Sequence, residues 1–187
     1  MYHSKVMRRV LVIGPGGAGK SSLAGQLGEV LSIEVLHLDK FYWQPGWIEP
    51  PKAEWAKTIE ALLSRDAWIM DGNYSGTLEL RFKACDTVIF LDLRRTLCIC
   101  RVLKRALIYR NQSRPDMTDG CNERVTLEFI LWIWNYSRRT KPKVVKLLES
   151  DPEKKIVWLR SPADVRNFLT LTGSRHDTTA VRHAVRE

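Results

Sequence analysis

Short apolar runs recur along the chain, separated by segments with helical periodicity. They are VLVI (10–13), EVLHL (34–38), AWIM (67–70), TVIFL (87–91) and KIVWL (155–159). Runs of this length between helices are typical of parallel strands that are covered on both faces. The pattern therefore predicts an α/β fold with a three-layer, doubly wound parallel sheet of five strands.

The apolar stripes between these runs predict where the helices bury their faces. The first two stripes are Leu23, Leu27, Val30 and Leu31, after a glycine-rich stretch, and Trp55, Ile59, Leu62 and Leu63, after Pro50–Pro51. The next two are Leu97, Cys100, Lys104, Leu107 and Ile108, and Val125, Phe129, Trp132, Ile133 and Tyr136. Each stripe repeats at three- and four-residue intervals, as one face of a helix does.

Local signals set the limits of the later helices. Pro142 lies where the fourth helix would otherwise continue, so that helix is expected to kink or split there. SPAD (161–164) predicts the start of the last helix, with Ser161 as N-cap. Residues 173–187 lack a clear apolar stripe and are predicted to form a flexible tail beyond a single domain at 1–172.

Length and composition are those of one globular domain. The chain has 187 residues and is 44% hydrophobic, enough for an independent core. Its longest apolar run, FILWIW (129–134), is far shorter than the roughly 20 residues of a membrane span. The first residues resemble no signal or transit peptide, and the four cysteines form no CxxC pair. We therefore expect a cytoplasmic protein with neither zinc nor a disulfide.

The glycine-rich stretch carries the strongest chemical signal. GPGGAGKS (14–21) satisfies G-x-x-x-x-G-K-[ST] and lies between a predicted strand and a predicted helix. Main-chain N–H groups of such a loop surround a phosphate, and the helix dipole adds to the attraction. Lys20 is expected to bridge the β- and γ-phosphates and Ser21 to hold Mg²⁺. The motif predicts a site for Mg²⁺ and ATP.

A phosphate loop also needs an acid near the metal, and two aspartates end apolar runs. Asp71 follows AWIM and Asp92 follows VIFL. The stretch WIMDGNYSGT resembles the segment of adenylate-kinase-like enzymes in which an aspartate ends the third strand. That resemblance and the position at a strand end favour Asp71 for the metal, while Asp92 is expected to cap a turn.

A third acid, Asp39, follows the second run in LHLDKFYW. A carboxylate there would take the proton from an acceptor hydroxyl, and DKFYW resembles the Asp-x-Phe-Tyr of uridine kinases, where the aspartate has that role. The aromatic residues around PGW suit stacking on an acceptor ring. An acceptor loop is therefore predicted at about 39–58; a surface aspartate and core aromatics are the alternatives.

The positive charge is concentrated in one segment. The net charge is +9, and the 13 basic and four acidic residues between Arg94 and Lys146 account for all of it. Arg101 and Arg105 lie on one helix face, and in adenylate-kinase-like enzymes such a pair contacts adenine and phosphates. A basic lid is predicted at about 108–124, with further phosphate-contacting candidates in Arg110, Arg114, Arg124, Arg138 and Arg139. A solvated face and a nucleic-acid patch remain alternatives.

Taken together, GPGGAGKS, HLDKFYWQPGW, WIMDGNYSGT, VIFLDLRRTLCICRVLKR, RPDMTDGCNER and FILWIWNY resemble the DNA topology modulation protein family, a branch of P-loop kinase-like proteins. The resemblance extends to about residue 170 and implies the strand order 2-3-1-4-5. The family name implies an effect on DNA supercoiling. The residues themselves predict a small-molecule phosphotransferase, so an effect on DNA would be indirect.

One departure concerns the acceptor. Adenylate kinases continue this segment as Asp-Gly-Phe-Pro-Arg-Thr, and the arginine grips the acceptor phosphate; here DGNYSGT has no arginine before Thr77. Either Arg81 replaces it, or the acceptor is an uncharged hydroxyl compound held by Asn73 and Tyr74.

The sequence thus predicts an ATP-dependent, Mg²⁺-dependent kinase. Its expected catalytic residues are Lys20, Asp39, Arg105 and Arg114, and its metal ligands Ser21 and Asp71. Its ATP-binding residues are Gly14, Pro15, Gly16, Gly17, Ala18, Gly19, Lys20, Ser21, Ser22 and Arg101. Its acceptor-binding residues are Asp39, Tyr42, Trp43, Trp47, Asn73, Tyr74 and Arg81. The rival prediction is a nucleotide-gated DNA-binding regulator; a GTPase is disfavoured because no Asn-Lys-x-Asp is present.

Overall fold

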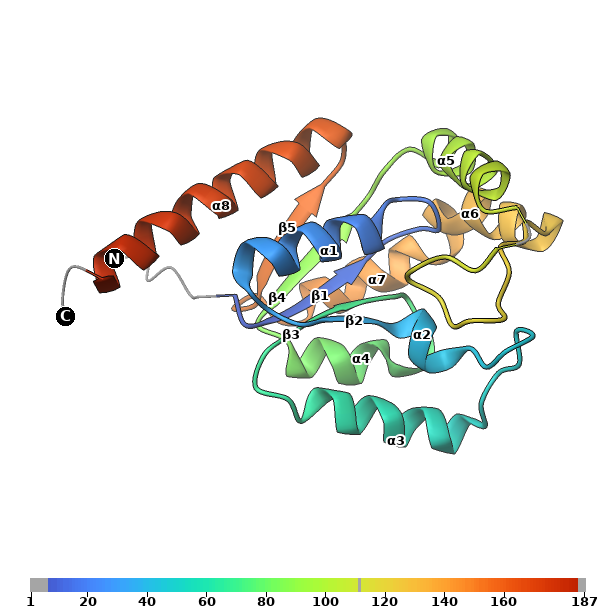
Figure 1. Ribbon diagram of the computed structural model, residues 1–187, viewed down its shortest axis with the longest axis horizontal. Coiled ribbons are helices and arrows are strands. Elements are labelled where there is room, and N and C mark those ends of the chain that lie inside the picture. Colours follow the sequence, from blue (N-terminus) through green and yellow to red (C-terminus); the bar gives the residue numbers. More distant parts are fainter. Residues whose placement is uncertain (1–6, 111, 185–187) are drawn as a thin grey trace.

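The computed structural model of the chain describes residues 7–110 and 112–184, with side chains as far as residue 174. One five-stranded sheet forms its centre (Figure 1). All pairings are parallel and the strand order is β2-β3-β1-β4-β5, so the predicted fold class and order are confirmed. The strands are β1 (Arg9–Ile13), β2 (Val35–His37), β3 (Trp68–Asp71), β4 (Thr87–Leu91) and β5 (Lys155–Leu159).

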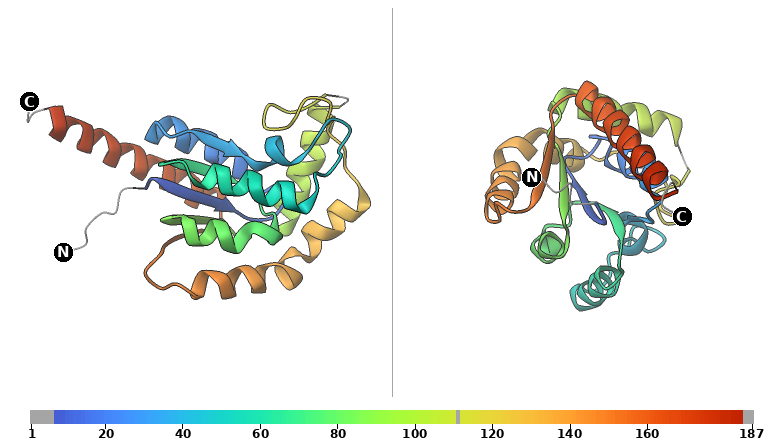
Figure 2. Two further views of the ribbon diagram at one scale, coloured as in Figure 1. Left: turned by 90° about the horizontal axis from the view of Figure 1, so that it is seen from below. Right: turned by 90° about the vertical axis from the view of Figure 1, so that its left-hand side faces the viewer.

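Helices connect the strands and cover both faces of the sheet (Figures 1 and 2). Their bounds are α1 (Lys20–Leu31), α2 (Leu38–Tyr42), α3 (Lys52–Leu63), α4 (Ser75–Ala84), α5 (Arg95–Ile108), α6 (Leu127–Arg139), α7 (Lys141–Glu149) and α8 (Pro162–Ala184). This is the three-layer arrangement that alternating strands and helices predict.

Alternate residues of β1 enter two separate cores, because side chains alternate along a strand. Leu11 and Ile13 face a core to which α3, α4 and α7 contribute. Val10 and Val12 face a second core formed with α1, α5 and α8. Helix α6 contributes to both, through Tyr136 in the first and Ile133 in the second, so it closes the end of the sheet nearest the phosphate loop.

The buried face of α5 differs from the predicted stripe. Cys98 and Val102 are its buried residues, whereas Leu107 is 78% exposed and Ile108 is 61% exposed. The predicted stripe at Leu97, Cys100, Lys104, Leu107 and Ile108 was therefore wrong. The buried face of α5 packs against the phosphate loop, where Cys98 and Val102 lie beside Gly17. The spacing of apolar residues alone did not predict this contact.

The predicted break at Pro142 is confirmed, since α6 ends at Arg139 and α7 begins at Lys141. The start of α8 is a capping box: Ser161 Oγ accepts from the N–H of Asp164, and the Asp164 carboxylate accepts from the N–H of Ser161. Helix α8 then continues to Ala184. The segment predicted to be a flexible tail is therefore helical over residues 173–184; 185–187 lie outside the described residues.

Thr172 explains part of this difference, because it is only 7% exposed and its hydroxyl donates to the carbonyl of Phe168. Helix α8 packs along α1, which supplies the apolar partner that the sequence pattern did not show. Among residues 7–110 and 112–184, no helix combines the length and apolar character that a bilayer-spanning segment needs.

Candidate active site

A cavity of about 1060 Å³ lies at the carboxyl ends of the strands. Its walls come from the phosphate loop after β1, the turns after β2, β3 and β5, helix α5 and the lid segment (residues 108–124). In open α/β sheets, ligands bind at this edge. The topology thus brings together residues that are far apart in the sequence.

The phosphate loop forms the floor of this cavity with residues 16–22. Helix α1 begins at Lys20, with no side-chain cap and no acidic residue in its first turn, so its amino end suits an anion. Lys20 Nζ donates to the carbonyl of Pro15 at 3.0 Å, and burial lowers the pKa of Lys20. Gly14 and Pro15 shape the loop but are not among the residues lining the cavity.

Ser21 and Asp71 meet at one edge of the loop. Ser21 Oγ donates to Asp71 Oδ2 at 2.7 Å, and Asp71 Oδ1 lies 2.8 Å from Nδ1 of His37. The hydrogen bond to Asp71 raises the pKa of His37. A hydroxyl and a carboxylate oxygen side by side are the ligand types that Mg²⁺ prefers, so the pair fits this ion.

Asp92, the competing acid, does not lie beside Ser21. Its Oδ2 accepts from Lys141 Nζ at 2.7 Å and from Trp158 Nε1 at 3.0 Å. The structure therefore brings Ser21 together with Asp71 and uses Asp92 in a contact between β4, β5 and α7.

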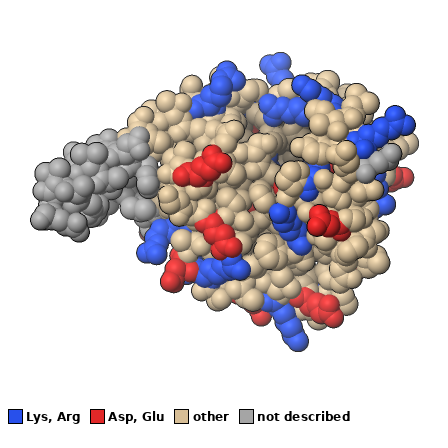
Figure 3. Space-filling model, viewed as in Figure 1, with Lys and Arg blue, Asp and Glu red and all other residues tan. Residues whose placement is uncertain are grey.

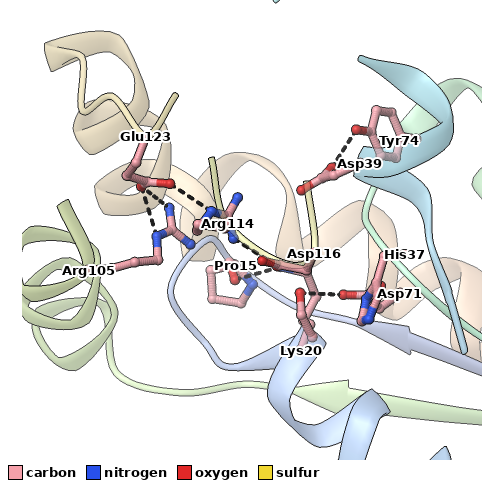
Figure 4. Close-up of polar contacts among 11 residues, drawn as sticks. Pro15, Lys20, His37, Asp39, Asp71, Tyr74, Arg105, Arg114, Asp116 and Glu123 are labelled. Atoms are coloured by element: carbon pink, nitrogen blue, oxygen red, sulfur yellow. Dashed lines mark hydrogen bonds and ion pairs between the residues drawn. The ribbon is translucent and has the colours of Figure 1, made fainter. Parts of the chain in front are cut away.

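Asp39 faces the same cavity from the start of α2. Tyr74 Oη donates to Asp39 Oδ1 at 2.5 Å (Figure 4). Burial raises the pKa of Asp39, and the Tyr74 hydrogen bond opposes that shift. Burial and the nearby Asp39 also raise the pKa of Tyr74, so Tyr74 keeps its proton and remains a donor. Asp39 is thus a half-buried carboxylate that Tyr74 holds in one orientation.

The aromatic residues of the acceptor loop (residues 39–58) divide into two groups. Trp43 and Trp47 line the cavity and contact each other edge to face, with ring centroids 5.2 Å apart. Tyr42 packs between Trp55 and Tyr74 and is not among the cavity-lining residues. The structure therefore gives Tyr42 a packing role in place of the predicted acceptor contact.

Arg81, the predicted substitute for the phosphate-gripping arginine, is fully buried at 0% exposure. Its guanidinium donates to the carbonyls of Gly72 at 2.8 Å, Asn73 at 2.5 Å and Tyr74 at 3.0 Å. These contacts use its donors inside the protein, and Arg81 does not line the cavity. The prediction that Arg81 binds the acceptor is corrected: it supports the turn after β3.

Asn73 lies at the cavity wall, but its amide is also committed to the phosphate loop. Its Oδ1 accepts from the N–H of Gly14 at 3.2 Å, and its Nδ2 donates to the Gly14 carbonyl at 2.7 Å. Asn73 thus ties the end of β3 to the start of the loop.

One acid that the sequence did not single out holds an arginine of α5 and an arginine of the lid segment at the cavity. Glu123, whose side chain is 2% exposed, pairs with Arg105 at 2.8 Å and with Arg114 at 2.7 Å. Arg114 also contacts Asp116 at 2.8 Å (Figure 4). Burial lowers the pKa of Arg105. The only available signal for Glu123 was its position as an acid within a strongly basic segment.

The other basic candidates fall into two sets. Arg101 lines the cavity and donates to the Ala18 carbonyl at 3.0 Å, and Arg124 lines it while lying over the Trp47 ring at 4.7 Å. Arg110, Arg138 and Arg139 are exposed and are not among its lining residues. On the face in Figure 3, Lys and Arg stand along the upper edge and mix with acids below.

Hydrogen bonds to main-chain carbonyls join the lid segment to the acceptor loop. The N–H of Gly46 donates to the carbonyl of Gly120 at 3.1 Å, and Trp47 Nε1 donates to the carbonyl of Asn122 at 3.1 Å. Thr118 Oγ1 donates to the carbonyl of Lys40 at 3.0 Å. The two segments therefore form one wall over the phosphate loop.

Comparisons with solved structures show a P-loop kinase fold. The shikimate kinase from Bacteroides thetaiotaomicron is 12% identical with a TM-score of 0.56, over 92% of this chain and 99% of that one. The Acinetobacter baumannii enzyme, in complex with shikimate, is 18% identical with a TM-score of 0.57, over 91% and 96%. No family model matches the chain, and no curated protein does. The resemblance to the DNA topology modulation family stays a prediction.

Proposed function

We propose that this protein is a Mg²⁺- and ATP-dependent kinase that phosphorylates a hydroxyl group of a small acceptor. The observation that carries the proposal is that Lys20 and Asp39 line one cavity. A phosphate-binding loop and a half-buried carboxylate in one cavity meet the two needs of phosphoryl transfer, which are charge stabilisation and proton acceptance.

In this proposal the loop residues 16–22 hold the triphosphate through their N–H groups, and Lys20 moves from the Pro15 carbonyl to the phosphates. Ser21 and Asp71 would hold Mg²⁺, which neutralises phosphate charge when bound. Arg105 and Arg114, already oriented by Glu123, stabilise the charge of the transferring group.

Asp39 acts as the base. The acceptor oxygen forms a bond to the γ-phosphorus as its proton passes to the Asp39 carboxylate, and the bond from phosphorus to the β–γ bridging oxygen breaks to release ADP. Tyr74 holds Asp39 in place through its hydroxyl. Because the pKa of Asp39 is raised, the carboxylate is a stronger base than an exposed aspartate.

The residues that line the cavity also indicate the chemical class of the acceptor. Trp43 and Trp47 place aromatic rings in the cavity lining, which suits contact with a flat ring, and Arg81 has its guanidinium committed to main-chain carbonyls. Glu49 adds a negative charge to the lining. These features favour an uncharged hydroxyl compound with a flat ring, such as a nucleoside, over a nucleoside monophosphate.

The test is release of ADP from Mg²⁺·ATP with panels of nucleosides, nucleoside monophosphates and other small hydroxyl compounds. We expect the nucleoside panel to accelerate release, and Lys20→Ala to abolish it. Asp39→Asn is expected to lose the acceleration while still binding ATP. Acceleration by monophosphates alone would overturn the acceptor class, and an unchanged rate in Lys20→Ala would overturn the kinase itself.

A nucleotide-gated DNA-binding regulator is the second candidate, and the exposed Arg138 and Arg139 favour it. Phosphate-backbone contacts predict duplex DNA affinity that falls steeply with salt and that changes with ATP. A flat salt response would remove this candidate.

A further inference from the structure

A second cavity, of about 430 Å³, lies next to the phosphate loop on the far side of α6 from the nucleotide cavity. Helix α6 separates the two: Phe129 and Trp132 line the first, and Ile133 and Tyr136 line the second. Pro15 lines only the second cavity. A ligand here would touch the phosphate loop without entering the proposed ATP site.

The amino end of α5 opens into this cavity through Arg94, Arg95 and Thr96. Helix α5 has 14 residues, and within the described chain no side chain caps it and no acidic residue stands in its first turn. Its first N–H groups therefore lack helical partners. Arg94 and Arg95 add positive charge at the positive end of the helix dipole, an arrangement that an anion would stabilise.

Tyr136 supplies a second, independent sign of a ligand. It is 3% exposed and lines the cavity, yet within the described residues its hydroxyl has no hydrogen-bond partner. Burial and the charge of Asp92 raise the pKa of Tyr136, so the hydroxyl keeps its proton. A buried donor left unpaired is destabilising, and an anionic oxygen in the cavity would accept from it.

The one acid in the cavity lining, Asp92, does not oppose an anion strongly. Lys141 pairs with its Oδ2 at 2.7 Å, and Trp158 donates to the same oxygen. With Asp92 offset by Lys141, the charge of Arg94 remains, together with that of Arg95, whose guanidinium lies over the Trp134 ring at 3.8 Å. Ser137 adds a hydroxyl from α6.

We propose that this cavity is an anion-binding site for the phosphate group of a small metabolite, separate from the nucleotide cavity. The amino end of α5, Arg94, Arg95 and the Tyr136 hydroxyl form its donor set. Such an array of main-chain and guanidinium donors around one anion is the arrangement that binds phosphate elsewhere in proteins. The site does not depend on the proposed kinase activity.

The test is an NMR titration of the full-length Lys20→Ala protein with inorganic phosphate, at ionic strength held constant with chloride. The Lys20 substitution weakens phosphate binding at the loop, and amide signals report each cavity separately. We expect saturable shifts of the Arg95, Thr96 and Ser137 amides. Arg94→Gln is expected to weaken this binding about tenfold, the effect of one lost charge-assisted contact.

Lys104→Gln is the matched control, because it removes an exposed positive charge from α5 outside the cavity; its phosphate affinity should match that of the parent. Tyr136→Phe removes only the hydroxyl and should weaken phosphate binding while leaving the thermal midpoint in chloride unchanged or higher. The proposal is overturned if the α5 amides show no saturable shift, or if Arg94→Gln and Tyr136→Phe both bind phosphate as the parent does.

Discussion

Arg81 could support the turn after β3 or bind the acceptor, and the substitution Arg81→Met distinguishes these two roles. If Arg81 supports the turn after β3, its loss leaves the carbonyls of Gly72 and Asn73 without their donor, whereas the Tyr74 carbonyl still accepts from the N–H of Thr77. Two unsatisfied carbonyls at about 2 kcal/mol each cost about 4 kcal/mol. Burial lowers the pKa of Arg81 from 12.5 to about 10, so removing the buried charge offsets about 3 kcal/mol of this cost. The expected net loss of unfolding free energy is about 1 kcal/mol.

Urea denaturation followed by tryptophan fluorescence measures this loss. With a slope near 2 kcal/mol per molar, the midpoint should fall by about 0.5 M. Lys83→Met is the matched control, because Lys83 lies on the same helix with its side chain 72% exposed; its midpoint should stay within about 0.3 M of the parent. If Arg81→Met unfolds like the parent but the KM for the acceptor rises, Arg81 contacts the acceptor and the structural interpretation is refuted.

Three further predictions follow from the contacts above. Asp39→Asn should lower kcat at least about 100-fold but raise the thermal midpoint at pH 7, because the raised pKa of Asp39 means that its charge is disfavoured in the folded protein. This stability difference should disappear below the ordinary pKa of 3.8, where Asp39 is protonated in both the folded and the unfolded state. A midpoint below that of the parent at pH 7 would contradict the prediction. Gly120→Val should detach the lid segment from the acceptor loop, because Gly120 has φ +81° and an added Cβ would lie 3.1 Å from Pro45; accelerated protease cleavage of the lid segment checks this. Ser161→Ala should lower unfolding free energy by about 1 kcal/mol through loss of the cap to Asp164, and an unchanged urea midpoint would contradict it.

The sequence predicted the sheet because its strands are buried on both faces and therefore appear as continuous apolar runs, as in TVIFL. It predicted the phosphate loop because that chemistry depends on neighbouring residues. The helix break at Pro142 and the start of α8 after Ser161 could be predicted for the same reason, because each depends only on neighbouring residues.

Long-range contacts were harder to predict. In the sequence, nothing distinguishes Arg81 from an exposed helical arginine. Its burial becomes evident only from the structure, where its guanidinium donates to three main-chain carbonyls. Glu123 reaches Arg105 across 18 positions, and no periodicity connects them. The exposure of Leu107 and the burial of Val102 depend on which face of α5 packs against the core. The spacing of apolar residues did not specify that face.

The contact between the phosphate loop and α6 has a consequence for how the chain acquires its shape. An added Cβ at Gly16 would lie 2.6 Å from the ring of Phe129, so the loop fits against a helix that is synthesised much later. Domains grow from the amino end on the ribosome. The nascent chain therefore carries its complete phosphate-binding sequence long before the support for that loop exists, and competence to hold a nucleotide is expected to arise only when α6 docks.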